Sequence, residues 1–262
     1  MIRTALTIAG SDSGAGAGIQ ADLKTFAAHR VYGTSAITAV TAQNTRGVTM
    51  WEAVAPALVR AQIASVVGDI RPDAVKLGML ANAAIVETVA DAIERFALSN
   101  VVLDPVIIAK GGGRLLEDAA VKAIRTKLIP CARIVTPNIP EAEVLSDMKI
   151  RGSDDVHEAA RRILGMGPGV VLIKGGHLGG PESVDLALTA QGSFELRGRR
   201  IETTSTHGTG CTLASAIAAN LALGLAVREA LQQAREYVEG AILHAPGVGA
   251  GHGPLNHFWR LY

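Results

Sequence analysis

Short apolar segments alternate with longer segments of helical periodicity along most of this chain, and this alternation restricts the fold more than any other feature. The apolar segments cover residues 3–10, 35–42, 73–80, 100–106, 132–138 and 169–176. The helical segments cover residues 18–30, 55–69, 82–97, 115–128 and 154–165. Strands with so few polar positions are buried on both faces, as in a parallel sheet covered by helices. The alternation therefore predicts an α/β fold.

The rhythm changes in the last third of the chain. Residues 183–203 contain two strand-like runs around the turn AQGS (190–193), which predicts a hairpin at the sheet edge. Three segments follow: helices over 210–223 and 227–244, and a loop over 247–262. Because no linker or repeat interrupts the 262 residues, of which 48% are apolar, we expect one domain spanning 1–262.

Composition and charge exclude several classes of partner. The 25 basic and 24 acidic residues nearly balance, and aromatic residues make up 3%, so nucleic acid is not an expected partner. The N-terminus lacks a signal-peptide pattern, and no apolar run reaches the roughly 18 residues that a membrane span needs. The two cysteines, Cys131 and Cys211, are far apart and neither belongs to a CxxC motif. This disfavours zinc and a disulfide framework, and indicates the cytoplasm.

Polar and glycine-rich segments follow the predicted strands. They are GSDSGAGAG (10–18), QNTRG (43–47), GML (78–80), DPVIIAKGGG (104–113), TPNIPEAE (136–143) and KGGH (174–177). Each lies just past the carboxyl end of a strand, and in open parallel sheets ligands bind at that edge. We therefore expect the functional site there. The glycine-rich segments 109–114 and 174–182 are candidates for lids over a nucleotide.

The first glycine-rich loop does not match a dinucleotide-binding motif. With Gly14 and Gly16 as the first glycines of GxGxxG, the last position is Ile19, and GxxxxGK[ST] is absent from the chain. Two interpretations stay open for the loop: a tight turn from strand to helix, or a backbone that a small molecule can approach closely.

The stretch STHGTGCTLASAIAANLALG (205–224) predicts an anion site. Gly208 and Gly210 permit backbone angles that point successive N–H groups at one spot, and the helix that begins there adds partial positive charge. Thr206 and Thr209 add hydroxyl donors. Phosphate fits this loop, but so does the oxyanion of acyl transfer. A serine hydrolase would need a GxSxG elbow, which the chain lacks.

The two cysteines receive different interpretations. Cys211 stands at the predicted helix N-terminus, where we expect a lowered thiol pKa, although a small residue packed under the turn would look the same in sequence. Cys131 lies between Pro130 and a predicted strand, and we expect it to be inert in the core.

Further residues at the same edge suit nucleotide chemistry. Lys174 would neutralise a phosphate as a point charge. Asn138 and Glu141 are spaced to face each other at a helix start and would hold Mg²⁺ through waters, with Asp104 as another candidate ligand. Each residue alone has a helix-capping or salt-bridge interpretation. Together, at one edge with an anion site, they favour phosphoryl transfer.

Several of these motifs resemble those of one enzyme family. They are LTIAGSDSGAGAGIQADLKTF, TAQNTRGV, KLGML, LDPVIIAKGG, TPNIPEAE, LIKGGH, STHGTGCTLASAIAA and GHGPLNHF. In order and spacing, from about Ala5 to Phe258, the chain is similar to the bacterial hydroxymethylpyrimidine/phosphomethylpyrimidine kinases of thiamine biosynthesis, in the ribokinase-like superfamily. The first loop departs mildly, with SDSGAGAG where relatives usually have SDSSGGAG.

The resemblance implies a three-layer α/β/α ribokinase-like fold with a mostly parallel central sheet, usually in a homodimer. It also implies ATP and Mg²⁺. The expected reaction phosphorylates the hydroxymethyl group of 4-amino-5-hydroxymethyl-2-methylpyrimidine and then converts the monophosphate to the diphosphate.

The resemblance also assigns residues. The family's pyrimidine contacts correspond to Gly10, Asp22, Gln43, Met79 and Val106. The family's phosphate lysine corresponds to Lys174 and its NxxE motif to Asn138 and Glu141. Together with the residues singled out above, we expect ATP contacts from Lys174, Thr206, Thr209 and Asn138, and Mg²⁺ at Asp104 and Glu141. The catalytic set is Cys211, Lys174 and the backbone of Gly208 and Gly210. Most superfamily members carry an aspartate base where this chain has Cys211, so we expect the cysteine to accept the hydroxyl proton or to act sterically.

Two alternatives stay open. A pyridoxine/pyridoxal kinase of the same cysteine-bearing type looks similar but lacks QNT at 43–45, where Gln43 offers a donor and an acceptor to a pyrimidine. A non-catalytic pyrimidine-binding regulator would not need Lys174, Asn138 and Glu141. The pyrimidine kinase is therefore the favoured interpretation.

Overall fold

A single sheet runs through the computed structural model, which describes residues 2–107, 116–175 and 182–261. Its strands are β1 (Thr4–Asp12), β2 (Tyr32–Asn44), β3 (Gly47–Ala53), β4 (Ala74–Leu77), β5 (Val101–Leu103), β6 (Ile134–Val135), β7 (Val170–Ile173), β8 (Glu182–Thr189) and β9 (Gly192–Arg199). The spatial order is β3-β2-β1-β4-β5-β6-β7-β8-β9.

The centre of the sheet is parallel and both edges are antiparallel. Strands β2, β1, β4, β5, β6 and β7 pair in parallel, so their carboxyl ends meet at one edge. Strands β8 and β9 form the predicted hairpin beyond β7, and β3 turns back antiparallel to β2. The expected α/β fold with a mostly parallel sheet and an edge hairpin is confirmed.

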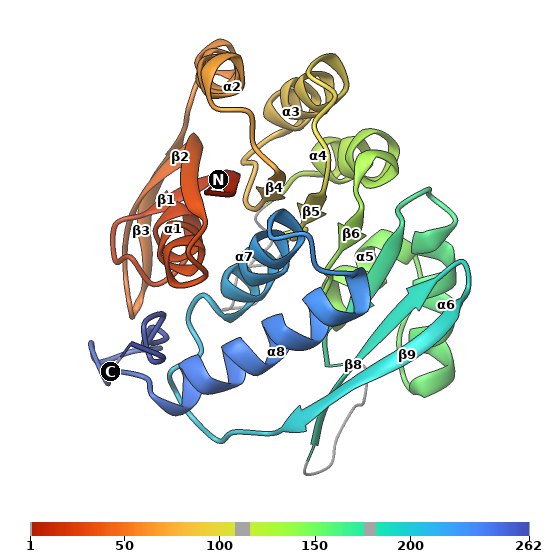
Figure 1. Cartoon of the computed structure of the whole chain (residues 1–262). Helices are drawn as coiled ribbons and strands as arrows, with labels where there is room; N and C mark the ends of the chain where they lie inside the picture. The colour runs from red at the N-terminus through yellow and green to blue at the C-terminus, as the bar shows by residue number, and fades with distance from the viewer. Residues whose placement is uncertain (1, 108–115, 176–181, 262) are drawn as a thin grey trace.

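Helices cover both faces of the sheet (Figure 1). They are α1 (Gly18–Ala28), α2 (Pro56–Asp69), α3 (Ala83–Arg95), α4 (Asp118–Ala123), α5 (Ile139–Ser146), α6 (Ser153–Leu164), α7 (Thr209–Ala222) and α8 (Val227–Leu243). One layer contains α1, α7 and α8, and the other contains α2 to α6. This is the expected three-layer α/β/α arrangement.

Each helical layer encloses its own apolar core. Along β4, Val75 and Leu77 face the core under α2 to α6, whereas Ala74 faces the core under α1, α7 and α8. Lys76 is turned toward that second layer and is completely buried. A charged residue in the middle of such a strand requires a partner, and its partner shapes the floor of the site described below.

Strand β3 is the main feature that the sequence patterns missed. All of its residues except Ala53 are exposed, so it lacks the apolar run that identifies the parallel strands. Its neighbour QNTRG, interpreted as a loop after a parallel strand, forms the end of β2 and the tight turn into β3. Cys131 was also misplaced: it is exposed at the end of a 3₁₀ turn, and its Sγ donates to the carbonyl of Lys127.

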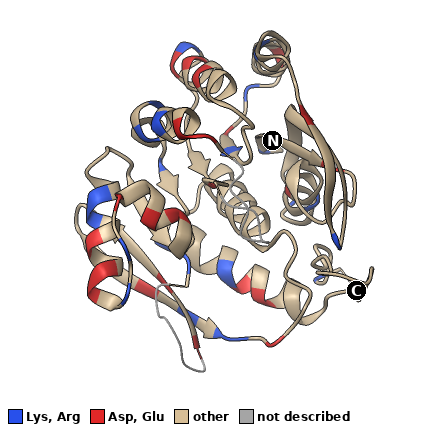
Figure 2. Ribbon diagram, turned by 180° about the vertical axis from the view of Figure 1, so that it is seen from behind, with Lys and Arg blue, Asp and Glu red and all other residues tan. Residues whose placement is uncertain are grey.

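Charged residues of both signs are interspersed along the outer helices, whereas the central strands carry few (Figure 2). No helix in the described ranges is long and apolar enough to cross a membrane. The expected lid segment 109–114 lies outside the described residues, as does most of the candidate 174–182.

Candidate active site

A cleft of about 1030 Å³ opens along the carboxyl edge of the sheet, where the polar segments predicted a site. The expected site residues that line it are Gly10, Gln43, Met79, Asp104, Val106, Asn138, Glu141, Lys174, Thr206, Gly208, Thr209, Gly210 and Cys211. Residues separated by up to 200 positions in the chain therefore meet in one cavity. Asp22 is the exception, because it lies beneath the cleft floor.

The anion loop requires glycine at its centre. Gly208 has φ +80°, and a Cβ atom there would lie 1.8 Å from the carbonyl oxygen of Gly16. Helix α7 begins at the next residue, Thr209, whose hydroxyl donates to the carbonyl of Thr206 at 2.7 Å. The loop thus packs tightly against the first glycine-rich loop and directs the start of α7 into the cleft, as an anion site needs.

Lys174 and Asp104 form an ion pair in front of this loop. Lys174 Nζ donates to Asp104 Oδ1 at 2.8 Å, and a Cβ atom on Gly210 would lie 3.2 Å from that ammonium. Burial lowers the pKa of Lys174, but Asp104 and Glu141 outweigh burial and hold the pKa above its ordinary value. A permanently charged ammonium therefore faces a helix N-terminus across a space that any side chain at 210 would fill.

Asn138 and Glu141 form a capping box at the start of α5. Asn138 Oδ1 accepts from the Glu141 N–H, and Glu141 Oε2 accepts from the Asn138 N–H, each at 2.9 Å. The capping interpretation is thus confirmed, and both residues also line the cleft. Burial raises the pKa of Glu141 to about 7, with Lys174 opposing and Asp104 reinforcing the shift.

The acidic pair fits a partly hydrated Mg²⁺. Asp104 and Glu141 are both almost fully buried, and the charge of Asp104 disfavours ionisation of Glu141, a repulsion that a divalent cation would relieve. No cluster of three or more His, Cys, Asp or Glu side chains that could hold a metal occurs among the residues the structure describes. Water and phosphate oxygens would therefore complete the coordination, as Mg²⁺ prefers.

Cys211 lines the cleft in the first turn of α7, but the expected effect on its acidity is wrong. Burial raises the pKa of the Cys211 thiol, and the acidic neighbours Asp22 and Asp104 add to this against the opposing charge of Lys76. The helix N-terminus therefore does not produce a resting thiolate. In the free protein the group is a neutral thiol.

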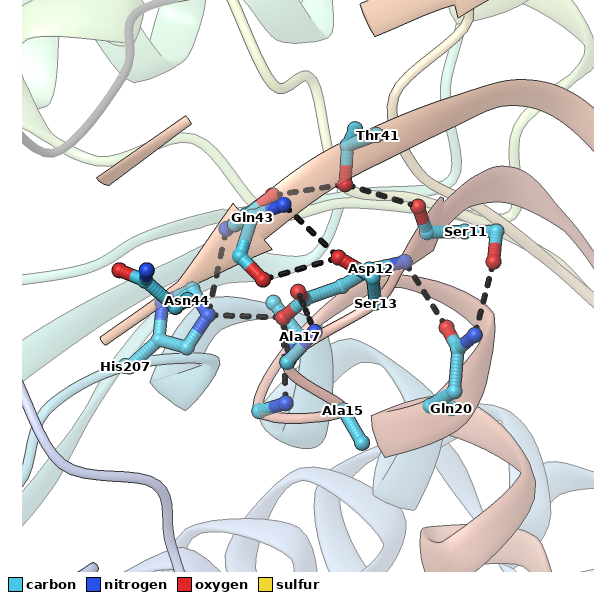
Figure 3. A network of polar contacts seen from close by, with 12 residues as sticks. Ser11, Asp12, Ser13, Ala15, Ala17, Gln20, Thr41, Gln43, Asn44 and His207 are labelled. Carbon is cyan, nitrogen blue, oxygen red and sulfur yellow. Dashed lines mark hydrogen bonds and ion pairs between the residues drawn. The ribbon is translucent and has the colours of Figure 1, made fainter. Parts of the chain in front are cut away.

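A network that the sequence patterns did not reveal joins the two glycine-rich loops (Figure 3). Asp12 Oδ2 accepts from His207 Nε2 at 2.8 Å and from the Ala17 N–H at 2.8 Å, while Oδ1 accepts from the Gly14 N–H at 2.8 Å. Burial raises the pKa of Asp12, but these hydrogen bonds more than compensate and keep the pKa below its ordinary value. The ionised carboxylate therefore fixes both loops.

Gln43 belongs to the same network (Figure 3). Its side-chain Nε2 lies 3.3 Å from His207 Nε2, and its Oε1 accepts from the Thr41 hydroxyl at 3.2 Å. Its backbone exchanges two hydrogen bonds with the Ser13 hydroxyl, at 2.7 and 2.8 Å. The Gln43 amide is thus held at the cleft wall, where the sequence placed a pyrimidine contact.

Beneath the cleft floor, Asp22 binds Lys76 in a sealed polar cluster. Lys76 Nζ donates to both Asp22 oxygens at 2.9 and 2.8 Å, and both side chains are 0% exposed. Thr7 and Ser215 donate to the same carboxylate at 2.6 and 2.7 Å. Four hydrogen bonds therefore occupy the Asp22 oxygens, and of the Asp22–Lys76 pair only Lys76 lines the cleft.

The far end of the cleft has a second ion pair. Arg235 of α8 pairs with Asp185 of β8, and Asp185 also accepts from the Gly175 N–H at 2.7 Å, next to Lys174. The buried Nε of Arg235 has no hydrogen-bond partner within the described part of the chain. Arg235 and Asp185 both line the cleft, so this ion pair bounds the cleft at the end that also contains Lys174.

The sequence analysis missed four residues of the cleft: Asp12, His207, Lys76 and Arg235. Each lies in a segment whose more prominent pattern concealed it. Asp12 and His207 are next to glycine-rich motifs that drew attention to the backbone. Lys76 does carry a usable signal, since a lysine inside an otherwise apolar strand needs a buried carboxylate partner.

The comparisons with known proteins agree with this geometry. The family model for phosphomethylpyrimidine kinase matches residues 12–256. The chain belongs to the phosphomethylpyrimidine kinase family. It is 51% identical over 259 residues to the hydroxymethylpyrimidine/phosphomethylpyrimidine kinase of Synechococcus elongatus, a match that covers 98% of each chain. It is therefore a kinase, as the motifs indicated.

Solved structures of this family and of a neighbouring one share the fold. Bacillus subtilis pyridoxal kinase, solved as an ADP complex, has TM-score 0.93 and 39% identity and covers 100% of both chains. The phosphomethylpyrimidine kinase from Clostridium difficile has TM-score 0.82 and 43% identity and covers 92% of this chain and 99% of that one. The ribokinase-like fold is confirmed, and a kinase of this fold binds a nucleotide.

Proposed function

We propose that this kinase transfers a phosphoryl group from ATP to 4-amino-5-hydroxymethyl-2-methylpyrimidine and then phosphorylates the monophosphate to the diphosphate, in thiamine biosynthesis. The observation that carries the proposal is that Gln43 and the anion loop line one cleft, with the Gln43 amide nitrogen 3.3 Å from His207 Nε2 next to that loop. The Gln43 amide can hydrogen-bond the amino group and a ring nitrogen of the pyrimidine, while the backbone N–H groups of the anion loop bind the phosphate.

The part of the cleft that contains the anion loop and Lys174 is the proposed ATP site. The loop at Gly208–Gly210 and Lys174 bind the phosphates, with Thr206 and Asn138 beside them. Asp104 and Glu141 would hold Mg²⁺, partly through water, and the ion would neutralise charge on the transferring group.

Cys211 is the proposed acceptor of the hydroxyl proton. It lines the cleft beside the anion loop, where the reacting hydroxyl must meet the phosphoryl group. Because its resting form is the neutral thiol, only the thiolate fraction accepts a proton, and the rate should rise with pH. Lys76 is the neighbouring charge that favours that thiolate.

The deciding experiment measures ATP consumption with Mg²⁺ on hydroxymethylpyrimidine, its monophosphate, pyridoxine and ribose in parallel. Turnover of the first two supports the proposal. A clear preference for pyridoxine would instead support the second candidate, a pyridoxine/pyridoxal kinase, which the likeness to the Bacillus subtilis pyridoxal kinase keeps relevant. Tight pyrimidine binding without turnover would support a regulator.

Gln43→Met tests the substrate assignment within the site. The variant removes the amide's donor and acceptor, so kcat/KM for the pyrimidine should fall about 10²-fold or more, with KM for ATP nearly unchanged. Gln191→Met, in the exposed turn between β8 and β9, is the matched control. Equal losses for pyrimidine and ATP would show that Gln43 does not contact the pyrimidine.

We also propose that the protein works as a cytoplasmic homodimer joined through the hairpin β2–β3. This hairpin exposes apolar side chains at the sheet edge, including Tyr32 (56%), Met50 (71%) and Trp51 (44%). Met50→Lys should therefore shift the mass measured by light scattering toward the monomer. Leu223→Lys, an exposed position at the far end of α7, should not.

A further inference from the structure

The C-terminal segment contains a motif, GHGPLNHF (251–258), to which the proposed reaction assigns no role. After α8 the chain returns toward the end of the β2–β3 hairpin instead of leaving the domain (Figure 1). It contacts the elements on both sides of the cleft, the hairpin turn and the anion loop, and it also reaches the first turn of α7.

At the hairpin, the segment binds the turn that follows Gln43. The His252 N–H donates to the carbonyl oxygen of Thr45 at 2.8 Å, and the Gly251 N–H donates to the Thr45 hydroxyl at 3.2 Å. A Cβ atom on Gly251 would lie 2.1 Å from the Thr45 carbonyl oxygen, so this contact requires glycine. The atom that a side chain at 251 would meet belongs to the backbone of Thr45, so it cannot move away by a side-chain rotation.

At the anion loop, the segment binds the residues that lead into Gly208. The His207 N–H donates to the carbonyl of Gly253 at 3.1 Å, and His207 and Pro254 form a β-bridge. A Cβ atom on the buried Gly253 would lie 2.8 Å from Ser205 Oγ but 3.5 Å from Ser205 Cβ. A side chain at 253 would therefore displace the hydroxyl of Ser205, which lies two residues before His207.

At α7, the segment ends against the residue after Cys211. His257 Nε2 and the Thr212 hydroxyl form a buried 3.1 Å hydrogen bond, and the Tyr237 hydroxyl donates to the His257 carbonyl at 2.6 Å. His257 is 3% exposed, and burial together with the nearby Lys24 lowers its pKa to about 4. The imidazole is therefore neutral and acts as a fixed hydrogen-bond partner.

We propose that residues 251–257 form a strap that positions the pyrimidine side and the anion side of the cleft relative to each other. The strap rests on the proposed function, because it sets the approach of the hydroxyl to the phosphoryl group. Displacements of about 1 Å at such a junction reduce rates by up to about 10²-fold. The residues of the strap are positioning residues, since the proposal requires no contact with substrate.

The two ends of the strap can be loosened separately. Gly251→Ala should lower kcat/KM for the pyrimidine about tenfold and leave ADP affinity, measured by calorimetry, within about twofold. Gly253→Ala should lower kcat and weaken ADP about tenfold, with a smaller change in KM for the pyrimidine. Gly68→Ala is the control, because a Cβ atom there meets nothing within 4 Å.

Ser205→Ala provides a rescue that a general loss of stability would not predict. It removes the Oγ that a side chain at 253 meets, so Gly253→Ala/Ser205→Ala should recover most of the lost kcat, while Ser205→Ala alone stays near wild type. A double variant as slow as Gly253→Ala would contradict the contact. If a glycine variant does not fold, Thr212→Val replaces it and should lower kcat, with Thr212→Ser restoring it.

The outcomes separate the strap from the reaction. Suppose that the wild type phosphorylates the pyrimidine and that the folded strap variants stay within about twofold of it in every kinetic and binding parameter. That result would overturn the proposed strap and leave the proposed function supported. A wild type without pyrimidine turnover overturns the proposed function. The ADP measurement then still tests the strap, because unchanged ADP affinity in Gly253→Ala would overturn it.

Discussion

Two aspartate–lysine pairs lie near each other in this protein, and they differ in how completely their hydrogen bonds are satisfied. Asp22 and Lys76 are both 0% exposed, and Thr7 and Ser215 also donate to the Asp22 carboxylate. Asp104 and Lys174 are 4% and 18% exposed, and one ion-pair hydrogen bond of 2.8 Å joins them at the cleft wall. The Asp22 carboxylate accepts four hydrogen bonds beneath the cleft floor, whereas Asp104 and Lys174 both line the cleft.

The difference separates a structural pair from a reactive one. A buried pair that is fully bonded stabilises the fold only while both partners remain, because either charge alone is expensive to bury. A pair at a cleft wall keeps donors on the ammonium for a phosphate, and Lys174 faces the anion loop with them. The comparison predicts that variants of the first pair change stability and variants of the second change the reaction.

Lys76→Met should have the largest effect. It leaves the Asp22 carboxylate buried without a counter-charge, so the free energy of unfolding should fall by about 3–5 kcal/mol in chemical denaturation. Lys149→Met, which removes an exposed ion pair with Glu143, is the control and should change it by less than about 1 kcal/mol. A Lys76→Met protein as stable as wild type would contradict the structural role of the first pair.

Lys174→Met should act mainly on the rate. Loss of one charged donor to the transferring phosphoryl group lowers kcat by about 10²–10³-fold. The loss of stability should be smaller than for Lys76→Met, because the Lys174 side chain lies partly open to the cleft. Steady-state kinetics and denaturation on the same two variants test the comparison directly. A large loss of stability with an unchanged kcat would reverse the roles of the two pairs.

The sequence analysis named Lys174 and Asp104 as separate site residues and missed Lys76, for a physical reason. Lys174, Asp104 and Glu141 follow the parallel strands β7, β5 and β6 at the sheet edge, and parallel pairing brings such positions together. Lys76 of β4 meets Asp22 of α1 only through their long-range side-chain contact, which strand periodicity does not encode. The family motif did flag Asp22, but only the structure shows that its oxygens are occupied.

The fold, like the site, was predicted only where the sequence pattern itself carries the information. Buried strands such as β1 and β7 have apolar runs that mark them in sequence, whereas β3 has exposed side chains and is held by pairing with β2. The predicted lowering of the Cys211 thiol pKa was wrong, because it considered the position of the cysteine at the helix N-terminus and not its burial. Burial and neighbouring carboxylates outweigh the helix terminus, and they depend on the complete tertiary structure.

Cys211→Ala tests the residue on which both pairs act, because the charges of Lys76 and Asp104 both change the pKa of this thiol. We expect kcat to fall about 10²-fold. Because the pKa of the thiol is raised, wild-type kcat should climb with pH through the neutral and mildly alkaline range, and the variant should lose that climb. Cys131→Ala, at the exposed cysteine, is the control. Near-normal turnover in Cys211→Ala would leave the cysteine only a steric role.

Ser215→Ala should have the smallest effect and gives the finest test of the comparison. It removes one donor of 2.7 Å from the Asp22 carboxylate and leaves Lys76 and Thr7 in place, so the free energy of unfolding should fall by about 1–3 kcal/mol. The kcat should stay within about twofold of wild type, because the variant keeps Lys76, whose charge acts on the Cys211 thiol, in its ion pair with Asp22. Ser193→Ala, on the exposed strand β9, controls for the loss of a hydroxyl. If kcat fell together with stability, a change at Asp22 would alter the cleft through Lys76. The two pairs would then form one functional unit.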